Sequence, residues 1–162
     1  MMKLNSTVYL YELLWVLPSL ALPVGMFAVL LVTTFGAEIH LPGVEGRVDP
    51  NRVDSTAPFD QPGVVQLGPG QYEVHMVSQV WSFDPAEISL PVGAEVTFVV
   101  TSSDVVHGLF IPYTHTNVML LPGQTSRVTA RFDQPGHYRF FCHEYCGLGH
   151  HTMSGEIMVE AQ

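Results

Sequence analysis

The stretch "TSRVTARFDQPGHYRFFCHEYCGLGHHTMSGEIMVEA", residues 125–161, indicates both the fold of the chain and its chemistry. Three runs within it are rich in β-branched and aromatic side chains, namely 125–132, 137–141 and 155–161, and "DQPG" separates the first two as a turn would. Between the second and third runs stand both cysteines of the chain, Cys142 and Cys146. The stretch therefore predicts three strands, with potential metal ligands on the last connecting loop.

The same pattern continues upstream from this stretch. Short β-rich runs separated by "DPA", "PVG" and "PGQ" occupy 71–81, 87–90, 94–102, 106–111 and 117–121. With the three runs described above, eight strands are expected and no helical periodicity interrupts them. Residues 71–162 are thus predicted to form an all-β domain, an antiparallel sandwich with Greek-key connections.

The N-terminal part of the chain has the composition of a membrane anchor. Residues 13–35, "LLWVLPSLALPVGMFAVLLVTTF", carry no charge, and a helix of that length rising about 1.5 Å per residue spans a hydrocarbon core of roughly 30 Å. A cleaved signal peptide has a shorter apolar region. We therefore predict one transmembrane helix within residues 1–35, followed by a linker over 36–70, which is rich in Gly, Pro and Asp and lacks regular periodicity.

The charge of the chain excludes one class of partner and favours another. Fifteen Asp and Glu residues against six Lys and Arg residues give a formal net charge of −9, and no basic run is present. Binding to nucleic acid depends on such basic patches, so it is not expected here. An acidic surface instead suits a cationic protein partner.

The cysteine cluster is compatible with several kinds of site. A disulfide between Cys142 and Cys146 would close only a small ring, which adds little stabilisation. A structural zinc site would take both cysteines with His150 and His107, but it would leave the thioether of Met153 without a role. His107 is included because it begins the run "HGLFIP", and a single loop needs a further ligand from a neighbouring strand.

Copper fits the donors better than zinc, because thiolate and thioether ligands are soft. A mononuclear blue copper site needs two histidines, one cysteine and a weak axial methionine, so one cysteine would stay unused. A dinuclear copper site, in which two thiolates bridge the metals, uses every donor in the cluster. The residues alone therefore favour two copper ions.

Three motifs resemble subunit II of the heme-copper respiratory oxidases, the subunit with the dinuclear copper A centre. They are "SSDVVHGLFIP" (102–112), "LLPGQTS" (120–126) and above all "CHEYCGLGHHTM" (142–153). The resemblance implies a cupredoxin-like sandwich. It also implies bridging thiolates from Cys142 and Cys146, with His107 and Met153 on one copper, and His150 and the carbonyl oxygen of Glu144 on the other.

The resemblance further implies a function and partners. The chain would accept electrons from a soluble cytochrome c or cupredoxin and pass them to heme in subunit I, where oxygen is reduced to water. The corresponding subunit of a copper-containing nitric oxide reductase is an alternative, and a membrane-tethered copper carrier is a second. The carboxylate of Glu144 resembles a family residue that helps hold a magnesium ion against subunit I.

Further details indicate which branch of this family the chain resembles most. The single apolar span is similar to the short subunit II of B-type prokaryotic oxidases, which implies a single-pass protein of the plasma membrane with its copper domain on the outer side. Gln79 stands where many members carry the first tryptophan of an aromatic cluster, whereas Trp81 is kept. Met119 stands where some members have an acidic residue for docking cytochrome c. His143 and His151, which flank ligands, would face away from the metals.

Overall fold

The computed structural model describes residues 6–36 and 46–161, so parts of the predicted anchor (1–5) and linker (37–45) and the last residue lie outside the described part. The chain divides into two compact units, Met1–Ile39 and His40–Gln162. Each unit is described by itself below.

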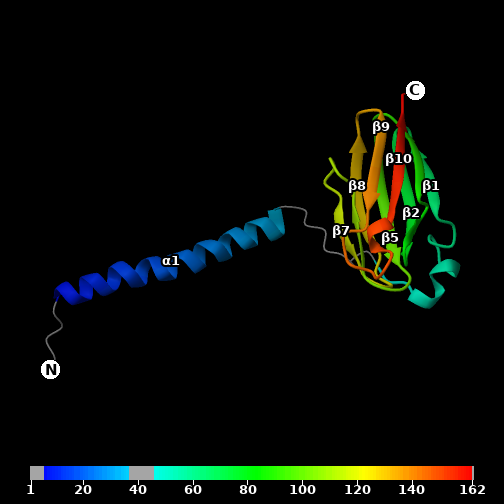
Figure 1. The fold of residues 1–162 in the computed structure, drawn as a ribbon. Coiled ribbons are helices and arrows are strands. Elements are labelled where there is room, and N and C mark those ends of the chain that lie inside the picture. Colours follow the sequence, from blue (N-terminus) through cyan, green and yellow to red (C-terminus); the bar gives the residue numbers. More distant parts are fainter. Residues whose placement is uncertain (1–5, 37–45, 162) are drawn as a thin grey trace. The chain divides into compact units, whose positions relative to one another are not determined.

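The described residues of the first unit form one helix, α1, over Ser6–Gly36 (Figure 1). The predicted apolar span 13–35 lies within it, and the helix begins earlier because no residue of 7–12 breaks it. Within Thr7–Gly36 a window of 18 residues has a mean hydropathy of 2.2, and the helix is long and apolar enough to cross a membrane. At about 1.5 Å per residue the helix is roughly 45 Å long, which exceeds a hydrocarbon core of about 30 Å.

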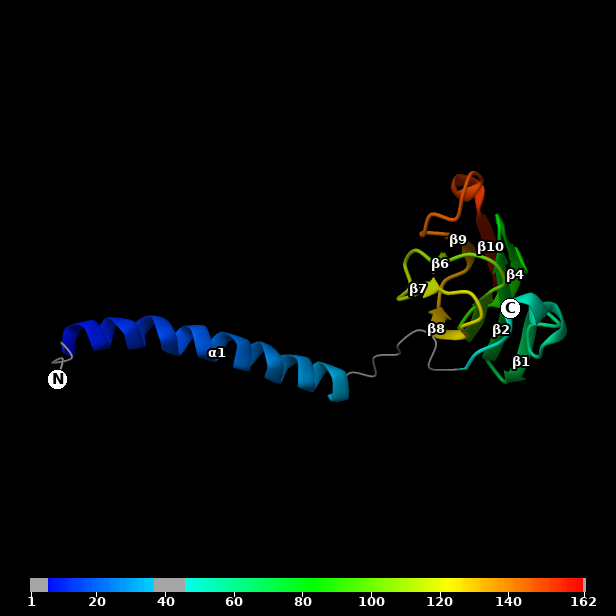
Figure 2. The same cartoon turned by 90° about the horizontal axis from the view of Figure 1, so that it is seen from below.

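The second unit is a two-layered β-sandwich (Figures 1 and 2). One sheet has the order β1-β2-β5-β8, with β3 paired to β2, and the other has the order β4-β10-β9-β6-β7. Within the described residues the strands are β1 (Gly63–Gly68), β2 (Gln71–Gln79), β3 (Ser82–Asp84), β4 (Glu87–Pro91), β5 (Ala94–Ser102), β6 (His107–Phe110), β7 (Asn117–Leu120), β8 (Ser126–Phe132), β9 (Gly136–Phe141) and β10 (Ser154–Glu160). All eight predicted runs are strands, while β1 and β3 were not predicted.

The sheets are mixed rather than purely antiparallel, which corrects the predicted pairing. Strand β2 pairs parallel to β5, with Gln71 opposite Glu95, and β10 pairs parallel to β4, with Glu156 opposite Glu87. The chain crosses to the other sheet for β4 before it returns to β5, and a crossover of this kind allows a parallel neighbour. The parallel pair β4–β10 places the last strand, which follows the cysteine loop, inside its sheet.

The core lies between the two sheets and follows the alternation of side chains along each strand. On β5 the residues Ala94, Val96, Phe98 and Val100 point inward and are each fully buried. Inward residues of the opposite sheet include Ile157, and the cysteines and Met153 belong to the same core cluster. The metal-ligand candidates are therefore continuous with the hydrophobic core rather than separate from it.

The segment 46–70 is not a free linker, which is a second difference from the sequence-based expectation. It contains a 3₁₀-helix, η1 (Pro50–Ser55), and strand β1. Val53 and Phe59 are 3% and 1% exposed and form a second apolar cluster with β2 and β5 residues on the outer face of the sheet. Val53 and Phe59 are isolated apolar residues in the sequence, so no periodic pattern of a strand or helix predicts their burial. The folded unit consequently begins before residue 71.

Candidate metal centre

The six predicted ligands come from one strand end and one loop. His107 is the first residue of β6, and Cys142 directly follows β9. The loop then carries Glu144 and Cys146 to a short 3₁₀-helix, η2 (His150–Thr152), and Met153 precedes β10. Because β9 and β10 are antiparallel neighbours, the loop returns on itself, and β6 on the other side of β9 supplies His107.

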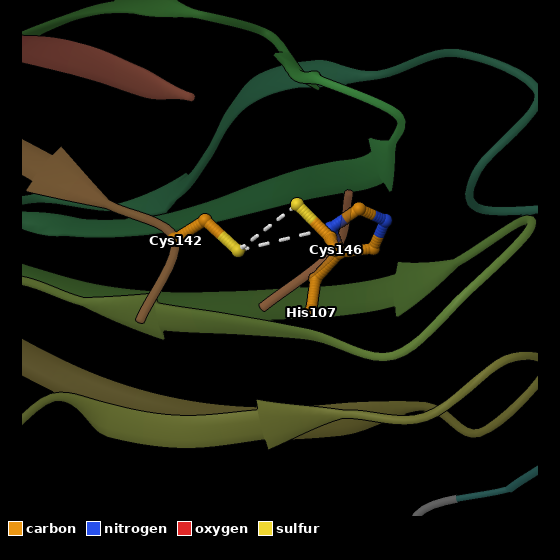
Figure 3. A group of neighbouring side chains, drawn as sticks. All are labelled: His107, Cys142 and Cys146. Carbon is orange, nitrogen blue, oxygen red and sulfur yellow. Dashed lines mark hydrogen bonds between the residues drawn. The ribbon is translucent and has the colours of Figure 1, made fainter. Parts of the chain in front are cut away.

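The two thiols and one imidazole lie at the centre of the site (Figure 3). Sγ of Cys142 is 3.8 Å from Sγ of Cys146 and 3.8 Å from Nδ1 of His107. The three potential ligand atoms lie within 4.8 Å of one another, and all three residues are buried. Both cysteines are free thiols, so the disulfide alternative is not what the structure contains.

The other three predicted donors surround the same pair of sulfur atoms. The carbonyl oxygen of Glu144 is 3.2 Å from Sγ of Cys142. Nδ1 of His150 is 3.6 Å, and Sδ of Met153 is 3.7 Å, from Sγ of Cys146. All six predicted residues are thus brought together, although their ligation of a metal is a proposal.

The chemistry of the donors fits copper. Two thiols, a thioether and two imidazole nitrogens form a soft set, and a thioether is a ligand that zinc sites do not use. Burial raises the pKa of the Cys146 thiol to about 11, and the hydrogen bond and charge of Cys142 act in the same direction. The Cys146 thiol is therefore protonated in the metal-free protein at neutral pH, and binding of a metal through its sulfur must displace this proton.

Asp104 fixes the ring of His107. Its Oδ1 accepts a hydrogen bond from Nε2 of His107 at 2.8 Å, so Nδ1 faces the sulfur atoms. The same carboxylate accepts bonds from the backbone amides of Val80 and Val105, both at 2.6 Å. Burial by itself would raise the pKa of the Asp104 carboxyl, but these amides and the His107 ring together lower it. A carboxylate partner of this kind orients a metal-binding histidine and sets its tautomer.

Trp81 contacts the ligand loop, a contact that the sequence analysis did not predict. Its Nε1 donates a hydrogen bond to the carbonyl oxygen of Cys146 at 3.2 Å. A Cβ placed on Gly149 would lie 2.5 Å from the indole ring, and one on Gly147 would lie 3.1 Å from Nε1. In the sequence, the two glycines of "CGLGH" could have indicated this contact, because residues without side chains leave room for a large ring against the loop.

Among the described residues, neither flanking histidine makes a hydrogen bond to the sulfur atoms, which is consistent with what the resemblance implied. Nε2 of His143 is 3.2 Å from the carbonyl oxygen of Val118 on β7. His151 is exposed in η2 and makes no side-chain hydrogen bond within the described residues. The carboxylate of Glu144 likewise has no hydrogen bond or ion pair within the part of the chain that the structure describes.

Comparison with known proteins identifies the family and agrees with the observed fold. A family model of the periplasmic domain of cytochrome c oxidase subunit II matches residues 73–162. Cytochrome c oxidase subunit 2 of Thermus thermophilus is 40% identical over 162 residues, which cover 98% of this chain and 96% of that protein. The match to the Thermus protein extends over the N-terminal helix as well as the head, whereas the family model covers the head alone.

Two solved structures of oxidase subunits share the fold of the β-sandwich. One chain of a heme-copper terminal oxidase dimer superposes with a TM-score of 0.69 and 36% identity, over 93% of this chain and 99% of that one. The periplasmic domain of cytochrome oxidase subunit II from Bradyrhizobium japonicum has a TM-score of 0.52 at 19% identity, over 56% of this chain and 84% of that one, and shows the fold alone. The predicted cupredoxin-like sandwich with one N-terminal apolar helix is confirmed. Because the family model matches more than half of the residues and a relative matches nearly all of them, the chain belongs to the cytochrome c oxidase subunit II family, whose members are subunits of an oxidoreductase complex.

Proposed function

We propose that the chain is the electron-entry subunit of a membrane-bound heme-copper terminal oxidase. It receives single electrons from a soluble cytochrome c or cupredoxin at a dinuclear copper A centre and passes them to heme in subunit I, where oxygen is reduced to water. The observation that supports this most directly is the gathering of two imidazoles, a thioether and a carbonyl oxygen around two buried thiols.

Each donor has a distinct role in this proposal. The thiolates of Cys142 and Cys146 would be shared by two copper ions. His107 and Met153 would be further ligands of one ion, and His150 and the carbonyl oxygen of Glu144 would be further ligands of the other. When bound, the copper pair supplies a one-electron redox couple whose charge is shared by both metals through the sulfur atoms.

The chain itself keeps these donors in place. The backbone amide of Cys142 donates a hydrogen bond of 3.1 Å to the carbonyl oxygen of Met153, which closes the loop that carries five of the donors. His107 is fully buried and is held by Asp104. Donors that cannot move and a site from which water is excluded both reduce the rearrangement that accompanies gain or loss of an electron.

The apolar helix and the family support a membrane location for the chain. Helix α1 anchors the chain as a single-pass protein in the plasma membrane of a prokaryote, and the copper domain lies on its outer side. Subunit I is the membrane partner. The free carboxylate of Glu144 is available to a magnesium ion at the interface with subunit I, because it has no partner in the described part of this chain.

The test uses the complex purified through a tag on this chain. We expect the complex to contain copper bound to this chain, to accept electrons from a reduced cytochrome c or cupredoxin, and to consume oxygen. The matched control is a complex with Cys142→Ser and Cys146→Ser, which should retain subunit I but lose electron entry from the protein donor. Consumption of nitric oxide without consumption of oxygen would instead identify a nitric oxide reductase. A colourless chain that binds zinc would overturn the proposal.

A further inference from the structure

The proposed copper site has two parts, His107 on β6 and the loop that follows β9. These two strands pair with each other at few positions. Strand β6, which carries His107, pairs with β7 at four positions, from His107 opposite Leu120 to Phe110 opposite Asn117. Between β6 and β9, which leads into Cys142, the described residues show a single pair, Phe110 opposite Phe141. The boundary between these two strands, here called the β6–β9 seam, therefore lies between the histidine ligand of β6 and the donors of the loop.

The side chain of His143 crosses this seam. His143 belongs to the loop and follows Cys142, but its Nε2 is 3.2 Å from the carbonyl oxygen of Val118 on β7. A carbonyl oxygen only accepts hydrogen bonds, so Nε2 carries the proton and donates. The hydrogen bond thus links the ligand loop to the β6–β7 pair by a route other than the strand pair at Phe110.

The ring of His143 lies against the backbone of Gly108, the residue after the ligand His107. The three atoms nearest to a Cβ placed on Gly108 all belong to this ring, at 2.3, 2.4 and 2.5 Å. Real Cβ atoms do not approach other atoms so closely, so the ring occupies the space that any side chain at 108 would fill. Gly108 has no positive φ, and its backbone conformation is therefore open to alanine as well.

We propose that His143 is a positioning residue that clamps β6 to the ligand loop across the β6–β9 seam and so holds His107 at its distance from Cys142. The inference rests on the proposed copper site. His143 does not contact the metals in this account; it acts through the backbone of Gly108 and Val118. Because the His143 side chain is exposed and lies outside the hydrophobic core, its removal affects the site more than the fold.

The first test measures release of copper from the full-length chain in detergent to an excess of a copper chelator. His143→Ala should release copper about tenfold faster than the wild type, the lower end of the range for residues that orient metal ligands. His143→Gln, whose amide is again a donor, should restore most of the retention. His151→Ala is the matched control, because His151 also follows a ligand and is exposed but holds nothing. It should release copper at the wild-type rate.

The second test is a double-mutant cycle with Gly108→Ala. Alanine at 108 displaces the ring, so the single variant should release copper about as fast as His143→Ala. With the ring already absent, the added methyl group has no atom to displace. The double variant should therefore be no worse than His143→Ala alone, and this non-additivity identifies the contact as the cause.

A third measurement reports on the copper itself rather than on folding. The unpaired-electron spectrum of copper-loaded His143→Ala should show altered coupling to the copper nuclei, while that of His151→Ala should match the wild type. Equal release rates and spectra for the two alanine variants, or additive effects of Gly108→Ala and His143→Ala, would overturn the clamp. A wild-type chain that binds no copper would overturn the proposed function, and the clamp with it.

Discussion

The indole Nε1 of Trp81 donates a hydrogen bond of 3.2 Å to the main-chain carbonyl oxygen of Cys146, a residue 65 positions later in the chain. Trp81 lies in the turn between β2 and β3, and the amide of the preceding Val80 bonds to Asp104, which in turn holds His107. The turn of Val80 and Trp81 therefore contacts the loop 142–153 directly through the indole ring, and it is linked to His107 through the carboxylate of Asp104.

The first prediction concerns this contact. Trp81→Phe keeps a ring over Gly149 but loses the hydrogen bond, whose net value is about 1 kcal/mol, so copper release should be roughly fivefold faster. Trp81→Ala also uncovers the loop and should release copper faster still. Stopped-flow release to a chelator measures both. Identical rates for the two variants would show that the hydrogen bond alone matters.

The second prediction concerns the bridge. Cys142→Ser or Cys146→Ser should each abolish the state in which one unpaired electron is shared by two copper nuclei, because a single thiolate remains to join them. Paramagnetic resonance of the partly oxidised full-length chain checks this. A shared electron retained in either variant would contradict the assignment of both cysteines as bridges.

The third prediction separates a weak ligand from a strong one. Met153→Leu preserves the volume of a side chain that is 2% exposed, so both copper ions should stay bound while the reduction potential shifts. His107→Ala removes a strong nitrogen donor and the sole donor from outside the loop, so copper content should fall sharply. Metal analysis combined with a redox titration distinguishes the two. Unchanged copper content in His107→Ala would assign the ligand to another histidine.

The fourth prediction concerns acid stability and a site far from the copper. Burial alone would raise the pKa of the Glu73 carboxyl, but hydrogen bonds from His75 at 2.7 Å and from Arg127 at 2.8 Å, together with the charge of Arg127, lower it. Because the folded pKa lies below the ordinary value of 4.5, this contribution to stability is full above pH 4.5 and is lost as the pH falls through the folded pKa.

Glu73→Gln should therefore lower the free energy of unfolding by roughly 1 kcal/mol at pH 7 and make it less dependent on pH in the acid range. Chemical denaturation at a series of pH values measures both quantities. Glu87→Gln, at an exposed glutamate of β4, is the matched control. An equal acid dependence in the Glu73→Gln variant and the wild type would contradict the assignment.

The fifth prediction concerns the electron donor. Residues 71–162 carry nine acidic residues and three arginines, while Met119, Trp81 and Leu148 present exposed apolar surface. Acidic surface should steer a cationic donor into a mainly apolar contact, so its association rate should fall with ionic strength, since charges farther apart than about 8 to 10 Å are screened at physiological salt. Stopped-flow reduction across a salt series measures this. A rate that rises with salt would exclude a cationic donor.

The sequence by itself determined the local features of this protein. Alternating apolar residues and turn motifs located eight strands, because side-chain direction in a strand depends only on sequence position. The length and composition of 13–35 located the helix. The spacing within 142–153 predicted that the side chains of Cys142, Cys146 and Met153 lie near one another, since one short loop carries them and must keep them close in any fold that closes it. The carbonyl oxygen of Glu144 was a candidate only through the family resemblance.

Only the tertiary structure decided the contacts between distant segments. The parallel pairs β2–β5 and β4–β10 depend on which sheet each strand joins, and alternation along a strand carries no information about its neighbour. The burial of Val53 and Phe59 depends on a sheet face that forms from residues farther along the chain. The contacts of Trp81 with Cys146 and of His143 with Val118 join residues 65 and 25 positions apart. Such pairs meet because the sandwich brings the ends of their strands together. The spacing of residues along the chain does not specify which strands become neighbours.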